Sequence, residues 1–530
     1  KHNAIYVATQ TNKVYAFDAD SGISLWPMRD FATYAIPEYP VPSPNADIGN
    51  RYCAVNHSPM IGITSTPVID LTSNTIYVEA FSGHTPGGGR IPPGNVDYPN
   101  GAAICQSTYT NVFSHRLHAI DITTGLEKFG GPIHLSAQAA GTADGGSVVF
   151  FNDAPQLQRP ALLLQNSTIY LGFGSFADTD PYHGWVVGVP ANFAGAGGNF
   201  PAFVTTPNSH EGGIWQAGHG LAGDAAGSVY AMTGNGTNHV EPYYAESFVK
   251  LPASLGNRPS AFYREPNVDS MDAADSDLGS SGPILLAGPA GFSGSNLLLG
   301  GGKEGFIYTI NTTNMSLIQK FSATYEPDAG TTLKNGGSCP RTFAPSHIHG
   351  APAYWNGPVG SRIYVWGERD YIKAFQLDAN GRVATAGNAL APSWCGPAGQ
   401  TSSQCGALAD VGTTIGAGGC GMPGGSIVIS SNGPLGGTGI VWAHHQKADS
   451  CTNPYVGATL FALDATDLNK ELWDSDMSAA DNLSYNAKGV PPVVANGRVY
   501  MATFDAQRTT GQAPVVTGRV RVYGLKQNNR

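Results

Sequence analysis

NKVYAFDADSGISLW, from Asn12 to Trp26, reads as a strand, a polar turn and a short return strand that ends in a large aromatic residue. In its first half Val14 and Ala16 alternate with polar or aromatic residues at period 2, which is typical of a strand. Asp18 can bond nearby backbone N–H groups, and Gly22 can supply a positive φ in the turn. The stretch is therefore predicted to be a β-hairpin.

The same pattern recurs in weaker form as LHAIDITTGLEKF (Leu117 to Phe129) and LFALDATDLNKELW (Leu460 to Trp473). A four-stranded sheet cannot bury both of its faces alone, so an array of such units buries them against one another. The aromatic residues at the ends of the copies, namely Trp26, Phe129 and Trp473, are predicted to dock on the neighbouring sheet.

About eight groups of strands follow one another along the chain, which favours an all-β, eight-bladed β-propeller, with seven blades as the alternative. A closed propeller leaves only short, protected sheet edges. We expect one propeller domain over residues 1–530, with a first blade that is incomplete and continues upstream of Lys1 or is completed by the last strands. Long loop insertions are expected at about 27–60, 82–114 and 385–420.

Composition agrees with a folded β-rich chain, since 41% of the 530 residues are hydrophobic, 12% are charged, and Gly and Pro number 69 and 37. A net charge of -10 without a run of Lys or Arg gives no electrostatic support for binding nucleic acid or an anionic membrane. No stretch approaches the roughly 18 apolar residues of a transmembrane helix. These properties exclude a nucleic-acid partner and a transmembrane segment.

Seven cysteines lie mostly in Gly-, Ser- and Pro-rich stretches, and none forms a C-x-x-C motif, so disulfides are favoured over metal or thioredoxin-like sites. Proximity in sequence suggests the pairs Cys53–Cys105, Cys395–Cys405 and Cys420–Cys451, with Cys339 left as a free thiol or for an upstream partner. Sequence alone does not fix the connectivity. Disulfides would place the protein in an oxidising compartment, secreted or periplasmic.

Six N-x-S/T sequences are candidate glycosylation sites, although Asn-rich turns also produce them by chance. They are Asn56, Asn166, Asn235, Asn311, Asn314 and Asn482.

The blade motif A-x-D-x-x-x-G-x-x-x-W resembles that of the quinoprotein alcohol dehydrogenases, the pyrroloquinoline quinone (PQQ) propellers. Longer phrases such as IYVATQTNKVYAFDADSG, GITSTPVID, YAMTGNGT, DSDLGSSGPILL and GGGKEGFIY are similar to a branch of secreted PQQ-propeller-like proteins. The likeness covers nearly the whole chain. It implies an eight-bladed propeller of the quinoprotein alcohol dehydrogenase type, whereas activity has to be argued from the site.

PQQ is a planar tricarboxylate o-quinone, so it needs cationic and polar groups at its rim, flat groups above and below it, and Ca²⁺ to polarise the reactive carbonyl. Calcium prefers six to eight oxygen ligands from carboxylates and amides. A carboxylate base must also take the proton of the alcohol as the hydride leaves.

The resemblance implies a role for several residues of this chain. Asn235 and Asp178 match the calcium ligands of the family. Asp277, or its neighbour Asp275, matches the catalytic aspartate, and Asp277 would also face the metal. Each has a structural interpretation too, as a turn residue or a solvated carboxylate.

Lys303 in GGKEGFIY resembles the lysine or arginine that touches the quinone, and Trp215 could be the ring on one of its faces. A loop charge and a core aromatic are the structural alternatives. Two departures from the family pattern bear on cofactor binding. The chain has no adjacent cysteine pair, which in the family covers the other face of PQQ, and Asp178 is one methylene shorter than the expected Glu.

A second candidate site is formed by His347 and His349 in SHIHGAPAYW, just before a predicted inner strand. At positions i and i+2 of an extended segment, two histidines point the same way and could hold a metal or an anionic ligand at the axial mouth. A third ligand is not identifiable from sequence; His183, His219, His444 and His445 are the possibilities. Hydrogen-bonding histidines at the start of a blade are the structural alternative.

Two functions stay open. The first, favoured by the missing cysteine pair, is an extracellular propeller that has lost quinone chemistry and serves as a binding or structural module for a protein or polysaccharide. The alternative is a PQQ- and calcium-dependent dehydrogenase of an alcohol or sugar, with Asp277 as base and Lys303 at the quinone.

Overall fold

The structure is a computed structural model that describes residues 3–42, 60–91, 112–176, 178, 180–216, 218–287, 296–324, 347–368, 370–385, 408–411, 422–447, 455–507 and 515–524. The chain divides into two compact units, Lys1–Asp275 and Ser276–Arg530, and each unit is described by itself. All seven cysteines, the Asn56 sequon and much of the three expected loop insertions lie outside the described residues.

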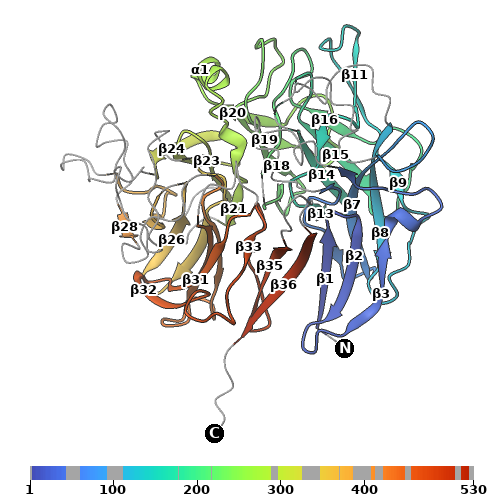
Figure 1. The fold of residues 1–530 in the computed structure, drawn as a ribbon. Coiled ribbons are helices and arrows are strands. Elements are labelled where there is room, and N and C mark those ends of the chain that lie inside the picture. The colour runs from blue at the N-terminus through green and yellow to red at the C-terminus, as the bar shows by residue number, and fades with distance from the viewer. Residues whose placement is uncertain are drawn as a thin grey trace. The chain divides into compact units, whose positions relative to one another are not determined.

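The elements of the first unit are shown in Figure 1. They are β1 (Ala4–Thr9), β2 (Lys13–Asp18), β3 (Ser24–Asp30), η1 (Phe31–Thr33), β4 (Val41–Pro42), β5 (Met60–Ile61), β6 (Val68–Asp70), β7 (Thr75–His84), β8 (Val112–Asp121), β9 (Ile133–His134), β10 (Gln138–Ala140), β11 (Val148–Phe150), β12 (Gln156–Leu157), β13 (Leu163–Gln165), β14 (Thr168–Ser175), β15 (Trp185–Pro190), β16 (Ala202–Val204), β17 (Ala222–Gly223), β18 (Val229–Met232), β19 (Ser247–Leu251), β20 (Ala261–Arg264) and α1 (Val268–Ala273).

Among these described residues, four antiparallel sheets have the form of propeller blades. Their strand orders are β1-β2-β3, β6-β7-β8-β9, β12-β14-β15-β16 with β13 also beside β14, and β17-β18-β19-β20. Two smaller pairs, β4-β5 and β10-β11, lie in the connections. The first of these sheets has three strands, whereas the others have four or five.

The second unit contains, in its described part, η5 (Leu278–Ser280), β21 (Ile284–Ala287), β22 (Asn296–Gly301), β23 (Phe306–Asn311), β24 (Ser316–Ser322), β25 (Ala353–Gly357), β26 (Gly360–Val365), β27 (Lys373–Gln376), β28 (Leu408–Val411), β29 (Ser426–Ser430), β30 (Ile440–Gln446), β31 (Ala458–Asp464), β32 (Asp467–Asp474), β33 (Tyr485–Asn486), β34 (Val493–Ala495), β35 (Arg498–Gln507) and β36 (Val515–Gly524). They form four further sheets, β21 to β24, β25 to β28, β29 to β32, and β35 with β33, β34 and β36 as its neighbours.

The described chain is therefore nearly all β, with eight blade-like sheets, and the predicted eight-bladed β-propeller class is confirmed. Among the described residues the α-helix is α1 in the first unit, and residues 476–481 form turns and bends. Within the described ranges, no helix is long and apolar enough to cross a membrane.

The repeated hairpin has the local chemistry that its sequence predicts. Val14 and Ala16 of β2 are buried, and Asp18 Oδ1 accepts hydrogen bonds from the backbone N–H groups of Asp20 and Ser21 at 3.0 and 2.8 Å. Asp121 Oδ1 does the same for the next two threonines of its own turn, at 2.9 and 3.0 Å. Gly22 and Gly125 end the two turns, both at φ +71°. The first polar residue of the motif thus closes the turn in both copies.

The aromatic residue at the end of the motif docks on the following sheet, as predicted for Trp26. Its indole N–H donates to the backbone oxygen of Ile122 at 3.2 Å, and its ring covers Gly125, whose missing Cβ would lie 2.8 Å from the ring. Trp473 similarly lies 5.1 Å from the ring of Tyr523 in β36. Phe129 is more exposed and touches Phe193 edge to face at 6.3 Å. Each unit is stabilised by such contacts together with the apolar layers between successive sheets.

Candidate functional site

Asp277 and Lys303 form a buried ion pair in the second unit. Lys303 Nζ lies 2.6 Å from Asp277 Oδ2, and the two side chains are 10% and 4% exposed. Asp277 precedes η5, while Lys303 lies in the turn between β22 and β23. Two residues predicted from separate motifs are therefore in direct contact.

The backbone holds this pair in place. Lys303 N donates to Asp277 O at 2.9 Å. A Cβ at Gly302 would lie 2.3 Å from the same oxygen, so only glycine allows the turn to approach so closely. Asp275, by contrast, is exposed at the end of α1 in the first unit. Of the two predicted catalytic carboxylates, Asp277 is buried against a lysine and Asp275 is exposed.

His347 and His349 meet a carboxylate that sequence reasoning missed. Glu368 lies just after β26 and forms an ion pair with each histidine. Its Oε1 is 2.9 Å from His349 Nε2, and its Oε2 is 3.8 Å from His347 Nδ1. One potential ligand atom from each of the three residues lies within 4.8 Å of the others. Burial is the main cause that lowers the pKa of His347 to about 4. No sequence motif marks Glu368 as a site residue. It meets the two histidines only because the fold places the end of β26 beside the histidine segment.

This histidine cluster is tied to the turn that carries Lys303. Ile348 N donates to Gly302 O at 3.2 Å, and Ser280 Oγ donates to Ile348 O at 2.7 Å. Glu368 N in turn donates to His347 O at 2.9 Å. The Asp277–Lys303 pair and the His347–His349–Glu368 cluster are therefore parts of one polar region of the second unit.

Of the other histidines considered as third ligands, His444 and His445 are buried in β30, where burial lowers their pKa values to about 3 and about 4. His445 lies close enough to Glu368 for that carboxylate to raise its pKa against this effect of burial, and its ring is 4.6 Å from that of Trp366. Burial likewise lowers the pKa of His219, in the first unit, to about 4. His183 belongs to a different cluster of the first unit, described below.

In the first unit, Asn235 has a carboxylate neighbour that the sequence did not indicate. Asn235 Nδ2 donates to Glu211 Oε2 at 3.1 Å, and both residues are buried. Glu211 has φ +69°, an unusual conformation for a residue with a side chain, and Gly212 N donates to Asn235 O at 2.6 Å. Asn235 is thus a buried side chain held against a carboxylate.

Asp178 and Trp215 have local partners in the same unit. Asp178 is exposed and accepts a hydrogen bond from Tyr182 Oη at 3.0 Å. Trp215 is buried; a Cβ on Gly174 or Gly213 would lie 2.8 Å from its ring, and the guanidinium carbon of Arg159 is 5.3 Å from the ring centre. These contacts support the structural interpretations of both residues.

No family model matches the chain, and no curated protein matches its sequence. Solved structures similar to it include the quinohemoprotein alcohol dehydrogenase ADHIIG from Pseudomonas putida HK5 (14% identity, 95% of this chain, 68% of that chain, TM-score 0.45). A europium-containing methanol dehydrogenase (13%, 94%, 72%, TM-score 0.41) and the computationally designed Ika8 protein (10%, 99%, 94%, TM-score 0.40) are also similar. These likenesses transfer no activity, and the fold class is established by the sheets themselves. By that architecture, the described chain has an eight-bladed β-propeller fold.

Proposed function

We propose that the chain is a PQQ-dependent dehydrogenase of an alcohol or a sugar, with Asp277 as the base and Lys303 as the cation beside the quinone. The observation that supports this most is the 2.6 Å contact between Asp277 and Lys303. The resemblance assigns the two roles to residues of two separate sequence motifs.

A buried ion pair has a desolvation cost that only close geometry and further hydrogen bonds offset. Here the ammonium gives the carboxylate a counter-charge while the surrounding residues exclude water. Such a carboxylate is held in one position, which is what proton abstraction requires.

The residues of each unit suit the two proposed cofactors. Lys303 offers the cationic donor that a tricarboxylate quinone requires, and the oxygens of Asn235 and Glu211 are hard ligands of the kind that Ca²⁺ prefers. Asp178 would not contribute in the arrangement described, since it is exposed and bonded to Tyr182. Glu211 therefore replaces Asp178 in the proposed ligand set.

In this proposal, a carboxylate oxygen of Asp277 takes the hydroxyl proton of the substrate, and the hydrogen on the adjacent carbon leaves with its two electrons as a hydride. Bound PQQ would supply the two-electron acceptor for that hydride. The alcohol becomes an aldehyde or ketone. Lys303 orients Asp277 through the ion pair, and Gly302 keeps the two segments close.

A second candidate function is an extracellular binding module for a protein or polysaccharide that no longer uses a quinone. It is favoured by the exposed position of Asp178, by the packing of Gly174 and Gly213 against the Trp215 ring, and by the lack of adjacent cysteines. Under either function we propose a secreted or periplasmic location.

The test is an absorbance titration of the full chain with PQQ and Ca²⁺, followed by dye reduction with a panel of alcohols and sugars. The dehydrogenase should develop a quinone band that bleaches with substrate. Asp277→Asn should retain PQQ and lose roughly 10²- to 10⁴-fold in turnover, the usual contribution of a general base.

Glu304→Gln is the matched control, because Glu304 is the next carboxylate on the same turn and pairs with Lys320 at 3.1 Å. It should leave turnover unchanged, and circular dichroism melts would verify that both variants fold. If the wild-type chain binds no PQQ at saturating concentration, the dehydrogenase is rejected and the binding module remains.

A further inference from the structure

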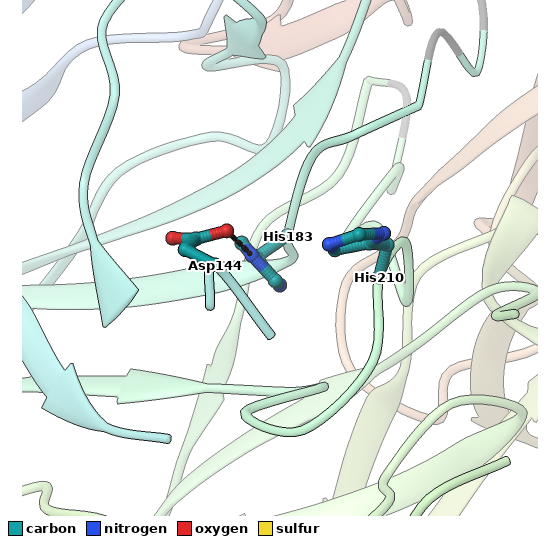
Figure 2. A group of neighbouring side chains, drawn as sticks. All are labelled: Asp144, His183 and His210. Carbon is teal, nitrogen blue, oxygen red and sulfur yellow. Dashed lines mark hydrogen bonds and ion pairs between the residues drawn. The ribbon is translucent and has the colours of Figure 1, made fainter. Parts of the chain in front are cut away.

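A second polar cluster, in the first unit, involves none of the residues assigned to quinone chemistry. Asp144 lies in the turn between β10 and β11, His183 lies two residues before β15, and His210 lies in the connection after β16. Figure 2 shows the three side chains directed toward one another, with a ring nitrogen of His210 turned toward His183. One ligand atom of each lies within 4.8 Å of the other two. We propose that Asp144, His183 and His210 form a Zn²⁺ site.

The distances suit a small divalent ion. His183 Nε2 lies 3.4 Å from Asp144 Oδ1, and the rings of His183 and His210 are 5.4 Å apart at 62°. Zinc bonds of about 2.0–2.2 Å in tetrahedral geometry place neighbouring ligand atoms about 3.4 Å apart. The first pair already has this spacing, and His210 needs only a small side-chain movement to complete it.

Each histidine has a polar group beside its other ring nitrogen. His183 Nδ1 lies 3.1 Å from Thr206 Oγ1, which fixes the ring so that Nε2 faces Asp144. His210 Nδ1 lies 3.2 Å from Asp180 Oδ1. Carboxylate or hydroxyl partners of this kind orient metal-binding imidazoles and increase their basicity.

The three ligand segments are positioned by backbone hydrogen bonds. Thr142 N and Ala143 N both donate to Pro207 O, at 2.9 and 3.1 Å, which joins the β10–β11 turn to the segment that leads to His210. Gly184 N donates to Glu211 O at 3.0 Å, which joins the His183 segment to the same connection. The site is thus preorganised, and little entropy remains to be lost when a metal binds.

Two imidazoles and one carboxylate favour zinc over calcium or magnesium, which prefer oxygen ligands. The His183 side chain is 6% exposed, while His210 and Asp144 are 24% and 40% exposed. Solvent therefore reaches the cluster, and the fourth tetrahedral position is available to water. Zinc here would fasten the β10–β11 turn to the connection that follows β16.

The experiment is calorimetric titration of Zn²⁺ into chelator-treated full-length protein in the absence of PQQ, so it is independent of the proposed dehydrogenase. A His349→Gln background removes the His347–His349–Glu368 cluster as a competing site. In that background we expect one equivalent of Zn²⁺ bound, and a rise in thermal midpoint on zinc addition. Co²⁺ should give the visible absorption bands of a tetrahedral nitrogen–oxygen site.

His210→Ala and Asp144→Asn should each weaken zinc binding by at least 10-fold and remove the cobalt bands. His134→Ala is the matched control, because His134 pairs with Asp153 at 3.1 Å on the same unit but belongs to no three-ligand group among the described residues. Asp144 lies in an exposed turn, so the Asp144→Asn variant removes one ligand without disturbing the core. Absence of zinc binding, or binding unchanged in both site variants, would overturn the proposal.

Discussion

His118 lies between two carboxylates in the first unit. Its Nδ1 is 2.7 Å from Glu127 Oε1 and its Nε2 is 3.0 Å from Glu38 Oε2, while the ring of Phe31 stacks on it at 3.7 Å. Burial alone would lower the pKa of His118, but the two glutamates outweigh it and raise the pKa to about 9. The imidazolium form is therefore stabilised in the folded chain.

We expect this histidine to make stability fall in alkaline solution. Its contribution is fully present below the ordinary pKa of about 6.5 and is lost as pH rises through about 9. The pKa difference corresponds to a free energy on the order of 3 kcal/mol. Urea denaturation at pH 6 and pH 9.5 would measure it, with His118→Gln as the comparison. If the variant loses as much stability over this interval as the wild type, the histidine is not the cause.

Residues with a local motif could be predicted from sequence, and residues without one could not. Asp277 and Lys303 lie in recognisable phrases, and the structure brings them together. Glu211, Glu368 and Asp144 lie in connections with no periodicity, and their partners are distant in sequence. Their roles depend on packing between segments, to which a single sequence gives no access.

At the scale of the element, the glycine of the repeated hairpin turn has different surroundings in two copies of the motif. Gly22 and Gly125 occupy the same motif position and the same φ of +71°. A Cβ on Gly22 would meet no atom within 4 Å, whereas a Cβ on Gly125 would lie 2.8 Å from Trp26 and Arg29. The first glycine therefore serves the turn alone, and the second serves the turn and the contact between sheets.

Gly22→Ala should cost about 1–2 kcal/mol, the usual penalty of a positive φ for an L-residue. Gly125→Ala should cost about 1–3 kcal/mol more, because Trp26 must move to avoid the new methyl group. The measurement is the difference between their urea denaturation midpoints at a common m-value. Equal destabilisation of the two variants would contradict the assigned docking of Trp26.

At the scale of the whole molecule, the fold class followed from the repeat, because eight groups of strands and turns are spread along the chain. The candidate site did not follow in the same way, since buried polar groups are distributed over strands and connections in both units. Among them are four histidines whose pKa values burial lowers to about 4 for His219, His347 and His445 and to about 3 for His444.

These histidines should make the molecule sensitive to acid. In the unfolded chain each binds a proton near pH 6.5, whereas the folded chain binds it only near pH 4 or below, so the free energy of unfolding falls as pH decreases through this interval. Each adds roughly 1.4 kcal/mol per pH unit to the slope. Denaturation at pH 7, 5.5 and 4.5 would measure it, and His444→Leu should reduce the slope. A free energy of unfolding that stays constant down to pH 4.5 would refute this expectation.

The unequal surroundings of Gly22 and Gly125 also bear on how the chain can change over generations. At Gly22 the space is open, so Asn or Asp, which tolerate a positive φ, could replace the glycine at little cost. At Gly125 any side chain meets the indole of Trp26, so a substitution at this position requires a simultaneous change of Trp26 in the preceding sheet. Natural variants should therefore accumulate at the first position and be purged at the second, although the two motifs read alike.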